Sequence, residues 1–378
     1  MIAIIGGGIG GLTLALVLKK LKIPFKVFEA SSDIKAVGAG ILLANNAMQI
    51  LKHLGLDDII ASKGSIVNRI LITDDHFDTL SEVRLEVFEE KYAVQNYAIH
   101  RADLYNIIAG AVGYENIELN KRLVTVRTEQ DGIHLTFSDG SVFKTQYLVG
   151  ADGIKSMVRQ QCFNYNVFRD AHQTCFRGVA KYKLPERYCN TAVEAWSKGK
   201  RFGFVNINED AVYWYAVLND NMLNNETAKN DMVSGFDPLV KEMVDKTAES
   251  FIIKGTIYDL KPMKLWAKEN VCLVGDAAHA TTPNMGQGAC QAIEDAYVLG
   301  ELLKIYPVKK AFEQLTGLRK EKVNFIVSTS WKIGKIGHWK NPYLVKMRNF
   351  MMKKMISDKT NLRQMDKLFQ LTEVRPGK

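Results

Sequence analysis

The sequence predicts an α/β protein in which a parallel-sheet domain, split by insertions, is joined to an antiparallel-sheet domain and followed by C-terminal helices. Three observations predict this class. An apolar strand, a glycine-rich turn and a helix open the chain, a similar strand–turn–helix pattern returns near residue 270, and alternating apolar segments lie between them. With 378 residues, the chain is long enough for two such units with a sizeable core.

The first thirty residues carry the most specific pattern in the chain. Residues 1–5 form an apolar run typical of a buried strand, and Gly6, Gly8 and Gly11 follow at the spacing of a dinucleotide-binding turn. In such a turn the first glycine closes a tight bend, the second lets backbone approach a pyrophosphate, and the third lets helix and strand pack closely. The following helix directs free N–H groups at the phosphates, which predicts a Rossmann-like domain.

Glu29 ends the second strand of this unit, where a carboxylate accepts hydrogen bonds from ribose hydroxyls. Its negative charge disfavours a 2′-phosphate, so NAD or FAD is favoured over NADP as the nucleotide in this fold. Residues 1–18 carry no charged side chain, which would also suit a secretory signal. No basic segment precedes them and glycines interrupt them, so the nucleotide turn is the better interpretation.

The composition favours a cytoplasmic globular protein. The cysteines form no C-x-x-C pair, and an odd, scattered set of thiols fits a reducing compartment and shows no metal-ligand spacing. The formal charge of +9 comes from residues 331–378, which hold 12 Lys or Arg and 3 Asp or Glu, whereas residues 1–330 hold 38 of each sign. A neutral body argues against a nucleic-acid-binding surface. The five cysteines are Cys162, Cys175, Cys189, Cys272 and Cys290.

Hydrophobic periodicity assigns the elements of the first half in order. Small residues from Gly38 to Ile41 suggest backbone that passes close to a flat or phosphorylated group. The dipeptides Asp131-Gly132 and Asp139-Gly140 predict the turns of an antiparallel meander. The expected helices are Leu12–Leu21, Asn46–Leu54 and a segment from Ile99 to about Ala111, and the expected strands are Phe25–Glu29, Ile66–Ile72, Ser81–Val87, Leu119–Arg127, Ile133–Phe137, Val142–Lys144 and Tyr147–Gly150.

The second half begins with alternating segments and ends with helices. Alternation of apolar and polar residues predicts a second, antiparallel sheet, and helical spacing predicts the rest. The expected strands are Thr174–Tyr182, Ala192–Trp196, Arg201–Ile207, Val212–Leu218, Phe251–Tyr258 and Asn270–Val274, and the expected helices are Asp237–Lys246, Ala289–Leu303, Val308–Val327, about Thr329–Ile336 and Pro342–Ile356.

Two further motifs follow buried strands. After the strand at 147–150 comes Asp152-Gly153, with Ser156 and Arg159 in the short helix behind it. Asp152 is placed to cap that helix and to pair with Arg159. After the strand at 270–274 comes Gly275-Asp276, where the aspartate is either a helix cap or a ligand contact. Pro283 and Gly286-x-Gly288 then precede a helix that carries Glu294 and Asp295.

In this order and over nearly the whole chain, the three motifs resemble those of the single-component (group A) FAD-dependent monooxygenases of the para-hydroxybenzoate hydroxylase class. The segment Pro283-Asn284-Met285-Gly286-Gln287-Gly288, followed by Glu294-Asp295, is similar to the branch of salicylate hydroxylase, urate hydroxylase and zeaxanthin epoxidase. The tail segment 333–339 is also similar to that branch.

The resemblance implies bound FAD. It places Glu29 at the adenosine ribose, the backbone of Leu123 at the adenine and Asp276 at the ribityl hydroxyls. It also makes Arg101 a cation for the cofactor, which would explain a positive charge in a first helical turn, and gives Asp152 a mixed role toward FAD and NAD(P)H. The implied cofactor contacts are Gly6, Gly8, Ile9, Gly10, Gly11, Glu29, Ala30, Gly40, Arg101, Leu123, Asp152, Asp276, Pro283, Gly286, Gln287, Gly288 and Ala289.

Arg201 and Tyr213 fall where urate hydroxylase has a substrate-contacting arginine and tyrosine, so they are the candidate catalytic residues. Arg201 would hold an anion, or would alternatively form a surface ion pair. Tyr213 alternates with Trp214 and Tyr215, a pattern that suits the core equally well. Asn284 replaces the aspartate of urate hydroxylase, which disfavours urate itself.

The family's activity implies a mechanism. NADPH or NADH reduces FAD, dioxygen forms a C4a-hydroperoxyflavin, and a small aromatic or other electron-rich substrate is hydroxylated. The alternatives are an isoprenoid epoxidase and a flavin-dependent reductase that does not hydroxylate. The expected partners are a small-molecule substrate and dioxygen. Neither a nucleic acid nor a metal is expected, and the expected assembly is a monomer or homodimer.

The motifs also predict a division of the chain. Residues 1–73, 99–161 and 263–305 are expected to form a discontinuous FAD-binding domain. Residues 74–98 and 162–262 are expected to form the substrate domain, and residues 306–378 a C-terminal helical region.

The basic tail allows two interpretations. Leu344, Met347, Met351 and Met355 recur at helical spacing on one face of the helix expected from residue 342. Such a helix could lie on an anionic membrane, or its apolar stripe could pack against the body and leave the lysines solvated. Packing is favoured because no long apolar anchor follows, so membrane contact is not expected.

Overall fold

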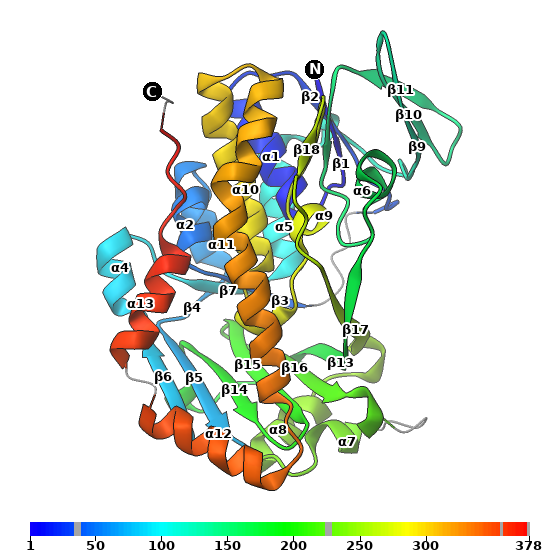
Figure 1. Cartoon of the computed structure of the whole chain (residues 1–378). Helices are drawn as coiled ribbons and strands as arrows, with labels where there is room; N and C mark the ends of the chain where they lie inside the picture. The colour runs from blue at the N-terminus through cyan, green and yellow to red at the C-terminus, as the bar shows by residue number, and fades with distance from the viewer. Residues whose placement is uncertain (34–38, 224–228, 356–357, 376–378) are drawn as a thin grey trace.

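The computed structural model describes residues 1–33, 39–223, 229–355 and 358–375. Figure 1 shows the parallel sheet and its helices above a second sheet of long strands, with one long helix, α11 (Val308–Gly337), running from the upper part down to the lower one. The predicted Gly38 contact lies outside these residues, as does the end of the helix expected at Ile356.

A six-stranded sheet with the order β18-β19-β12-β1-β2-β8 forms the upper unit. Its neighbours are parallel except for the edge strand β18, which confirms the Rossmann-like prediction. Helix α1 packs against both α5 and α10 beside this sheet. The elements are β1 (Ile2–Ile5), β2 (Phe25–Phe28), β8 (Ile117–Glu118), β12 (Tyr147–Gly150), β18 (Ala267–Lys268), β19 (Val271–Leu273), α1 (Ile9–Lys20), α5 (Arg101–Val112) and α10 (Gly288–Ile305).

The predicted meander is present as β9 (Leu123–Glu129), β10 (Gly132–Phe137) and β11 (Val142–Thr145), all antiparallel. It packs on the parallel sheet through Phe28, whose ring contacts those of Phe137 and Phe143. The first strand begins four residues later than predicted because the N–H groups of Asn120 and Lys121 donate to the carbonyls of Ser31 and Glu29 instead. Helix α6 (Met157–Phe163) lies beside β9.

A seven-stranded sheet with the order β17-β13-β16-β15-β14-β5-β6 forms the lower unit. The predicted antiparallel pairing holds except between β5 and β14, which pair in parallel. Helices α7 (Lys229–Val233) and α8 (Pro238–Asp245) cover one face. The strands are β5 (Arg69–Asp74), β6 (Thr79–Arg84), β13 (Phe168–Lys181), β14 (Thr191–Trp196), β15 (Lys200–Asn208), β16 (Ala211–Asn219) and β17 (Ile253–Leu260).

A small sheet of β3 (Gly40–Leu43), β7 (Tyr97–His100) and β4 (Ser65–Ile66) lies where the two units meet. The strand expected to run to Val87 ends at Arg84, because residues 86–92 form helix α4 instead. The other elements are α2 (Asn45–His53), α3 (Asp57–Lys63), α4 (Glu86–Tyr92), α9 (Asp276–His279) and the short 3₁₀ helices η1 (Tyr114–Asn116), η2 (Glu186–Tyr188), η3 (Asp220–Met222), η4 (Glu249–Phe251) and η5 (Pro283–Met285).

The C-terminal helices differ from the prediction in two respects. The two helices expected between 308 and 336 are one continuous helix, α11, and a further helix, α13 (Asp358–Phe369), follows α12 (Pro342–Met355). The expectation that the stripe on α12 packs inward is wrong, since Leu344, Met347 and Met351 are exposed and Val345 and Met352 are buried instead.

The division into FAD-binding, substrate and C-terminal parts stays a proposal. The strand order suggests one adjustment to it. Because β5 begins at Arg69 and pairs with β14 in the lower sheet, the first boundary would fall near residue 68.

Two adjacent carboxylates in the middle of α10, Glu294 and Asp295, are fully buried. Asp295 accepts from Arg319 Nε at 2.8 Å and from the backbone N–H of Gly275 at 2.9 Å, and its other contact is His279. Burial acts to raise the pKa of Asp295, but the charges of His279 and Arg319 outweigh it and hold the pKa at about 2. The carboxylate therefore fixes the turn at Gly275 in place.

Glu294 joins the remaining elements around α10. It accepts from Lys322 at 2.8 and 2.9 Å, from the Thr372 hydroxyl at 2.8 Å and from the Asn46 amide at 3.2 Å, and it pairs with Arg319. These partners come from α11, the C-terminal segment and α2. A buried carboxylate is tolerated only with such compensation, so the network holds these elements in one arrangement.

We expect Arg319→Met to lower the free energy of unfolding by about 3–5 kcal/mol, because it leaves two buried carboxylates without their shared cation. Urea unfolding of the FAD-bound protein measures it. The control is Lys310→Met in the same helix, where the exposed pair with Glu313 should change stability by less than about 1 kcal/mol. Equal effects of the two substitutions would contradict the role given to the network.

Candidate functional site

The glycine turn between β1 and α1 shows three different constraints. Gly6 has φ +104°, and a Cβ there would collide with the carbonyl of Ala151, while a Cβ on Gly11 would collide with the carbonyl of Gly6. Gly8 differs, because nothing lies within 4 Å of where its Cβ would be. Gly6 and Gly11 are thus required by the fold, whereas Gly8 faces open space at the start of a helix, where a phosphate would fit.

Glu29 lies against this turn. Its Oε2 accepts from the backbone N–H of Gly7 at 2.7 Å, and its Oε1 accepts from that of Ser31 at 2.8 Å. The predicted contacts Ile9 and Gly10 lie in the first turn of α1, and Ala30 directly follows Glu29. Carboxylate and glycine turn are therefore held together, with lone pairs of the carboxylate left for a ligand.

Leu123 and Asp152 border the same end of the sheet. Leu123 begins β9, two residues after Lys121, whose N–H donates to the carbonyl of Glu29 at 2.8 Å. Asp152 Oδ2 accepts from the N–H groups of Met157 and Val158, so Asp152 binds the start of α6 as expected. Its Oδ1 is buried without a hydrogen-bond partner in the described part of the chain, and burial raises its pKa.

The expected pairing of Asp152 with Arg159 is wrong. Arg159 is fully buried and donates to the carbonyls of Ala277, Ile154 and Tyr165 instead. Three carbonyls satisfy the guanidinium without a carboxylate, and they join α6 to α9.

Arg101 begins α5 and is exposed. Its backbone N–H donates to the carbonyl of Ala39 at 2.8 Å, but its guanidinium has no hydrogen-bond or ion-pair partner within the described ranges. Gly40, the next residue, lies directly on the side chain of Tyr213, where any Cβ would collide. An unpaired cation in a first helical turn is unfavourable by itself, so a bound anion accounts for it best.

Asp276 is the first residue of α9 and is exposed, although Gly275 and Ala277 on either side are buried. The N-cap position of α9 is held by Gly275 and Asp276 follows it in the first turn, which disfavours the helix-cap interpretation. The surrounding protein raises its pKa by desolvation, and the charges of His279 and Arg101 oppose that change. An open carboxyl group in the interior of the fold is a ready acceptor for ligand hydroxyls.

The segment from Pro283 to Ala289 forms η5 and the first turn of α10. Gly286 has φ +62°, and a Cβ there or on Gly288 would meet no atom nearer than 3.8 Å, so both face open space. Gln287 is buried and accepts from Gln291 Nε2 at 2.9 Å. The free N–H groups of this first turn provide a positive end that would stabilise negative charge on a ligand.

Side-chain alternation divides the seven-stranded sheet into two faces. Phe202 and Trp214 point to the face under α7 and α8, where their rings stack. The register pairs Arg201 with Val217 and Val205 with Tyr213, so Arg201 and Tyr213 share the opposite face, toward the nucleotide-binding unit. The structure thus brings both candidate catalytic residues to the side that the cofactor motifs occupy.

Arg201 is 1% exposed, so the surface ion-pair interpretation is wrong. Its Nη1 lies 3.0 Å from Glu194 Oε1, and its Nη2 donates to the side-chain oxygen of Asn284 in η5. Its Nε–H is buried without a hydrogen-bond partner among the described residues. The arginine is therefore paired within the protein, and its Nε–H is a buried donor that no described residue satisfies.

Tyr213 is half-buried and packs on Gly40, with its ring centroid 6.0 Å from that of Tyr215. Burial raises the pKa of Tyr213 above its usual range, so the phenol stays protonated at neutral pH. It borders the site as a neutral hydroxyl and not as a base.

Sequence reasoning missed Glu194 and Tyr215. Glu194 accepts from Arg201, from the Tyr215 hydroxyl and from the Trp196 indole. The sequence did contain a signal for Glu194: it is the single carboxylate in the apolar strand Thr191–Trp196, and a carboxylate in such a strand requires a buried partner.

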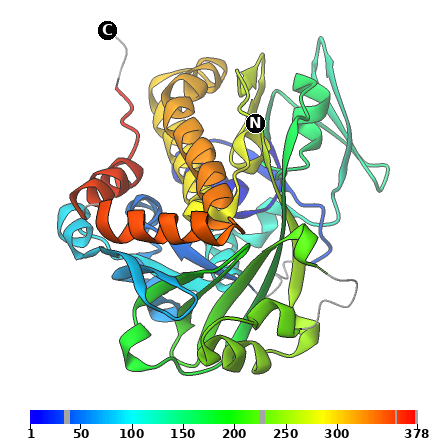
Figure 2. The same cartoon turned by 60° about the horizontal axis from the view of Figure 1, so that its bottom comes forward.

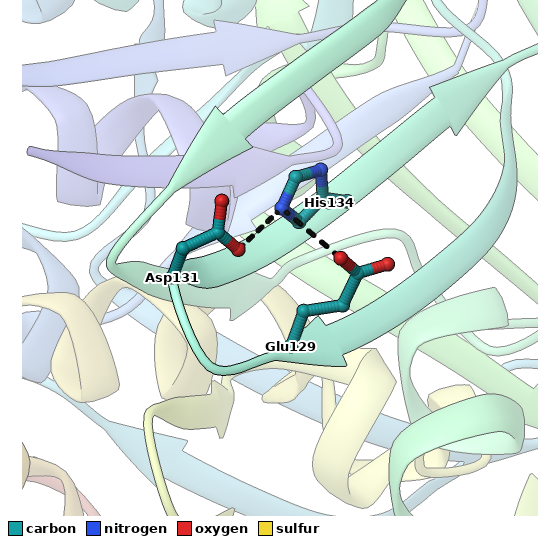
Figure 3. A group of neighbouring side chains, drawn as sticks. All are labelled: Glu129, Asp131 and His134. Atoms are coloured by element: carbon teal, nitrogen blue, oxygen red, sulfur yellow. Dashed lines mark hydrogen bonds and ion pairs between the residues drawn. The ribbon is translucent and has the colours of Figure 1, made fainter.

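Two groups of acidic and histidine side chains lie outside this site. Figure 3 shows Glu129, Asp131 and His134 on the β9–β10 hairpin, and the other group is Asp170, His172 and Asp220. In the first, Lys144 pairs with Asp131, and the carboxylates are exposed. We assign no metal to either group, because Lys144 already neutralises a carboxylate of the first and both groups lie mostly in solvent.

Fold and site together define a dinucleotide-binding flavoprotein: a Rossmann-like sheet with a glycine turn, an acid at the second strand and an open carboxyl near a third turn. Residues 1–315 match the model of the FAD binding domain family. The chain belongs to this family.

Its relatives are monooxygenases. The chain is 34% identical to aurachin C monooxygenase/isomerase of Stigmatella aurantiaca, over 96% of both proteins, and 28% identical to 2-heptyl-3-hydroxy-4(1H)-quinolone synthase of Pseudomonas aeruginosa, over 92% of both. The solved structure of Klebsiella pneumoniae HpxO complexed with FAD and uric acid has a TM-score of 0.87 at 25% identity and covers 97% of this chain and 96% of that one. The chain is an FAD-dependent monooxygenase of the aromatic hydroxylase class.

We expect Gly8→Ala to weaken FAD binding at least about tenfold, because the new methyl group would occupy the space where backbone approaches the pyrophosphate. The FAD-free protein should lose about 1 kcal/mol of stability or less, since the space is open without ligand. FAD titration by fluorescence and urea unfolding measure the two effects.

Gly110→Ala is the matched control. A Cβ there also meets nothing within 4 Å, but Gly110 lies on the exposed side of α5, so FAD affinity should not change. Unchanged affinity in Gly8→Ala would contradict the placement of the pyrophosphate.

Proposed function

We propose that the protein uses NADH or NADPH and dioxygen to hydroxylate an uncharged nitrogen heteroaromatic ring of the alkylquinolone kind. The single observation that carries the substrate class is the state of Arg201, which is buried, already paired with Glu194 and left with an Nε–H that no described residue accepts. A paired arginine is a poor receptor for a carboxylate, but its spare N–H suits a neutral acceptor such as a ring carbonyl.

Two titratable residues near Arg201, His338 and Tyr215, are both uncharged. Burial and the charge of Arg201 lower the pKa of His338 to about 3, so its ring is neutral at working pH. Burial and Glu194 raise the pKa of Tyr215 well above its usual value. Asn284 adds an amide where the similar urate hydroxylase has an aspartate, which also favours a neutral substrate.

The relatives support the ring type. The Pseudomonas aeruginosa relative is named for a 4(1H)-quinolone carrying a heptyl chain and a 3-hydroxy group, and the HpxO structure holds uric acid. Both are nitrogen heteroaromatic compounds. None of the relatives named here is an epoxidase or a simple reductase, so neither alternative is proposed.

Bound FAD would supply the activation of dioxygen, and we propose which residues hold it. Gly8 to Gly11 and Arg101 would bind the pyrophosphate, with Glu29 and Ala30 at the ribose, Leu123 at the adenine and Asp276 at the ribityl chain. The open glycines of the 283–289 segment would lie beside the flavin ring, and Gly40 would lie across from them.

Three further expectations stay proposals. Asp152, with one unsatisfied oxygen, would face FAD or the nicotinamide cofactor in addition to its structural role. The cytoplasm is the proposed location, supported by the lack of disulfides among the described cysteines. The proposed assembly is a monomer or homodimer.

The substrate class is tested with the FAD-bound protein by NADH and NADPH oxidation in the presence of 2-heptyl-4(1H)-quinolone, salicylate or urate. We expect the quinolone to stimulate oxidation at least about tenfold more than either anion and to yield a product one oxygen atom heavier, because the paired arginine does not favour negative charge. Stimulation by salicylate alone, or oxidation without oxygen transfer, would contradict the proposal.

We expect Arg201→Lys to raise KM for that substrate about 10- to 100-fold with little change in FAD content, since a lost hydrogen bond to a charged group costs about 1.5–3 kcal/mol. Lysine keeps the charge next to Glu194, so the fold should survive. The control is Arg84→Ala in β6, whose ion pair with Glu82 is exposed and should leave kinetics unchanged. An unchanged KM in Arg201→Lys would restrict Arg201 to a structural role.

A further inference from the structure

Helix α12 lies at the lower edge of the molecule in Figure 1 and on the side that comes forward in Figure 2. It packs on β6 through one narrow stripe, formed by Val345, Arg348 and Met352. Met352 joins Leu80 and Trp196 in a small core cluster. One face of α12 is therefore enough to hold the helix on the body.

The opposite face of α12 is apolar and exposed. At 100° per residue its large side chains fall on the side away from the packed stripe, spread over about one-third of the helix circumference. Single exposed apolar residues are ordinary, but a contiguous group on one helix marks an interaction surface. The exposed fractions are Tyr343 82%, Phe350 62%, Met347 46%, Met351 42% and Leu344 40%.

Lysines accompany this apolar face. Lys346 and Lys353 fall on one flank of it, and Lys354 falls within it, and all three are exposed. The helix contains no acidic residue, and the whole segment 331–378 holds 12 basic and 3 acidic residues. The surface therefore combines apolar contact with strong positive charge.

We propose that α12 binds the surface of an anionic lipid bilayer, with its aromatic and methionine side chains in the headgroup region and its lysines on lipid phosphates. A helix with an apolar face and lysines beside it is the arrangement that lies in a membrane interface. No helix in the described part of the chain is long and apolar enough to cross a bilayer, so the contact is peripheral.

A second copy of the chain fits this face less well. A symmetric dimer places the same patch on both partners, so the lysines of one α12 would meet those of the other. That like-charge contact is unfavourable, whereas an anionic lipid surface complements the same lysines.

Helix α12 also lies close to the candidate site, with only Gly337 of α11 between Arg348 and Arg201. Arg348 on the packed side of α12 donates to the carbonyl of Gly337 at 3.0 Å and stacks on Trp196 at 5.2 Å. Gly337 packs against Arg201, since a Cβ there would lie 2.9 Å from Arg201 Cδ. A membrane contact at α12 would therefore bring the site close to a bilayer that dissolves apolar substrates.

The test is co-sedimentation of the FAD-bound protein with vesicles of phosphatidylglycerol and phosphatidylcholine at physiological salt, and with vesicles of phosphatidylcholine alone. We expect pelleting with the anionic vesicles, at least tenfold weaker with the neutral ones. The triple variant Tyr343→Ser, Met347→Ser, Phe350→Ser and the triple variant Lys346→Gln, Lys353→Gln, Lys354→Gln should each lose at least tenfold in vesicle affinity while retaining FAD.

Matched controls carry the same substitutions at exposed positions elsewhere: Val142→Ser, Phe251→Ser, Leu265→Ser for the apolar set, and Lys22→Gln, Lys63→Gln, Lys309→Gln for the lysines. Both controls should pellet like the parent protein. Two results overturn the proposal: no pelleting of the parent protein, or pelleting lost equally in the controls. If the parent protein instead forms a dimer that the serine variant dissociates, α12 is an interface between copies and the membrane assignment is wrong.

Discussion

Glu294 and Asp295 lie side by side in α10 with no exposed surface. The rest of the site is arranged around the cations and N–H groups that stabilise these two buried negative charges. Arg319 binds both carboxylates, so α11 cannot move independently of α10. Asp295 also accepts the N–H of Gly275, the residue before the open carboxyl of Asp276. Because a buried charge without a partner is costly, this set of contacts has one satisfactory arrangement. It fixes both the turn at Gly275 and the first turn of α10.

The second determinant of function is the position of charged side chains where the upper and lower units meet. Arg201 comes from the lower sheet and Asn284 from the segment before α10, and their hydrogen bond joins the proposed substrate face to the proposed flavin face. Glu194 removes the net charge of the arginine without removing all of its donors. A site of this kind discriminates by hydrogen-bond geometry, since an unpaired buried donor or acceptor is penalised more than a satisfied one is rewarded.

The same arrangement relates the site to the outer surface. α11 contributes Gly337, against which Arg201 packs, and the carbonyl of Gly337 receives Arg348 from α12. Through these contacts, the helix with the exposed apolar and basic face is attached to the wall of the candidate site. An enzyme for a water-soluble anion would have little use for such a surface, whereas the neutral ring and alkyl chain proposed here would partition into a bilayer.

The sequence by itself determined the local features: the glycine turn, Glu29, the return of the strand–turn–helix pattern near residue 270 and most element boundaries. These follow from constraints among residues close in sequence, such as the collision that a Cβ at Gly11 would make with the carbonyl of Gly6. Tertiary structure decided the pairing of Arg201 with Glu194 and Asn284, the carbonyl partners of Arg159, the continuity of α11 and the outward apolar face of α12. Periodicity shows that a helix has an apolar face, but which face is buried depends on the surface that segments distant in sequence present to it.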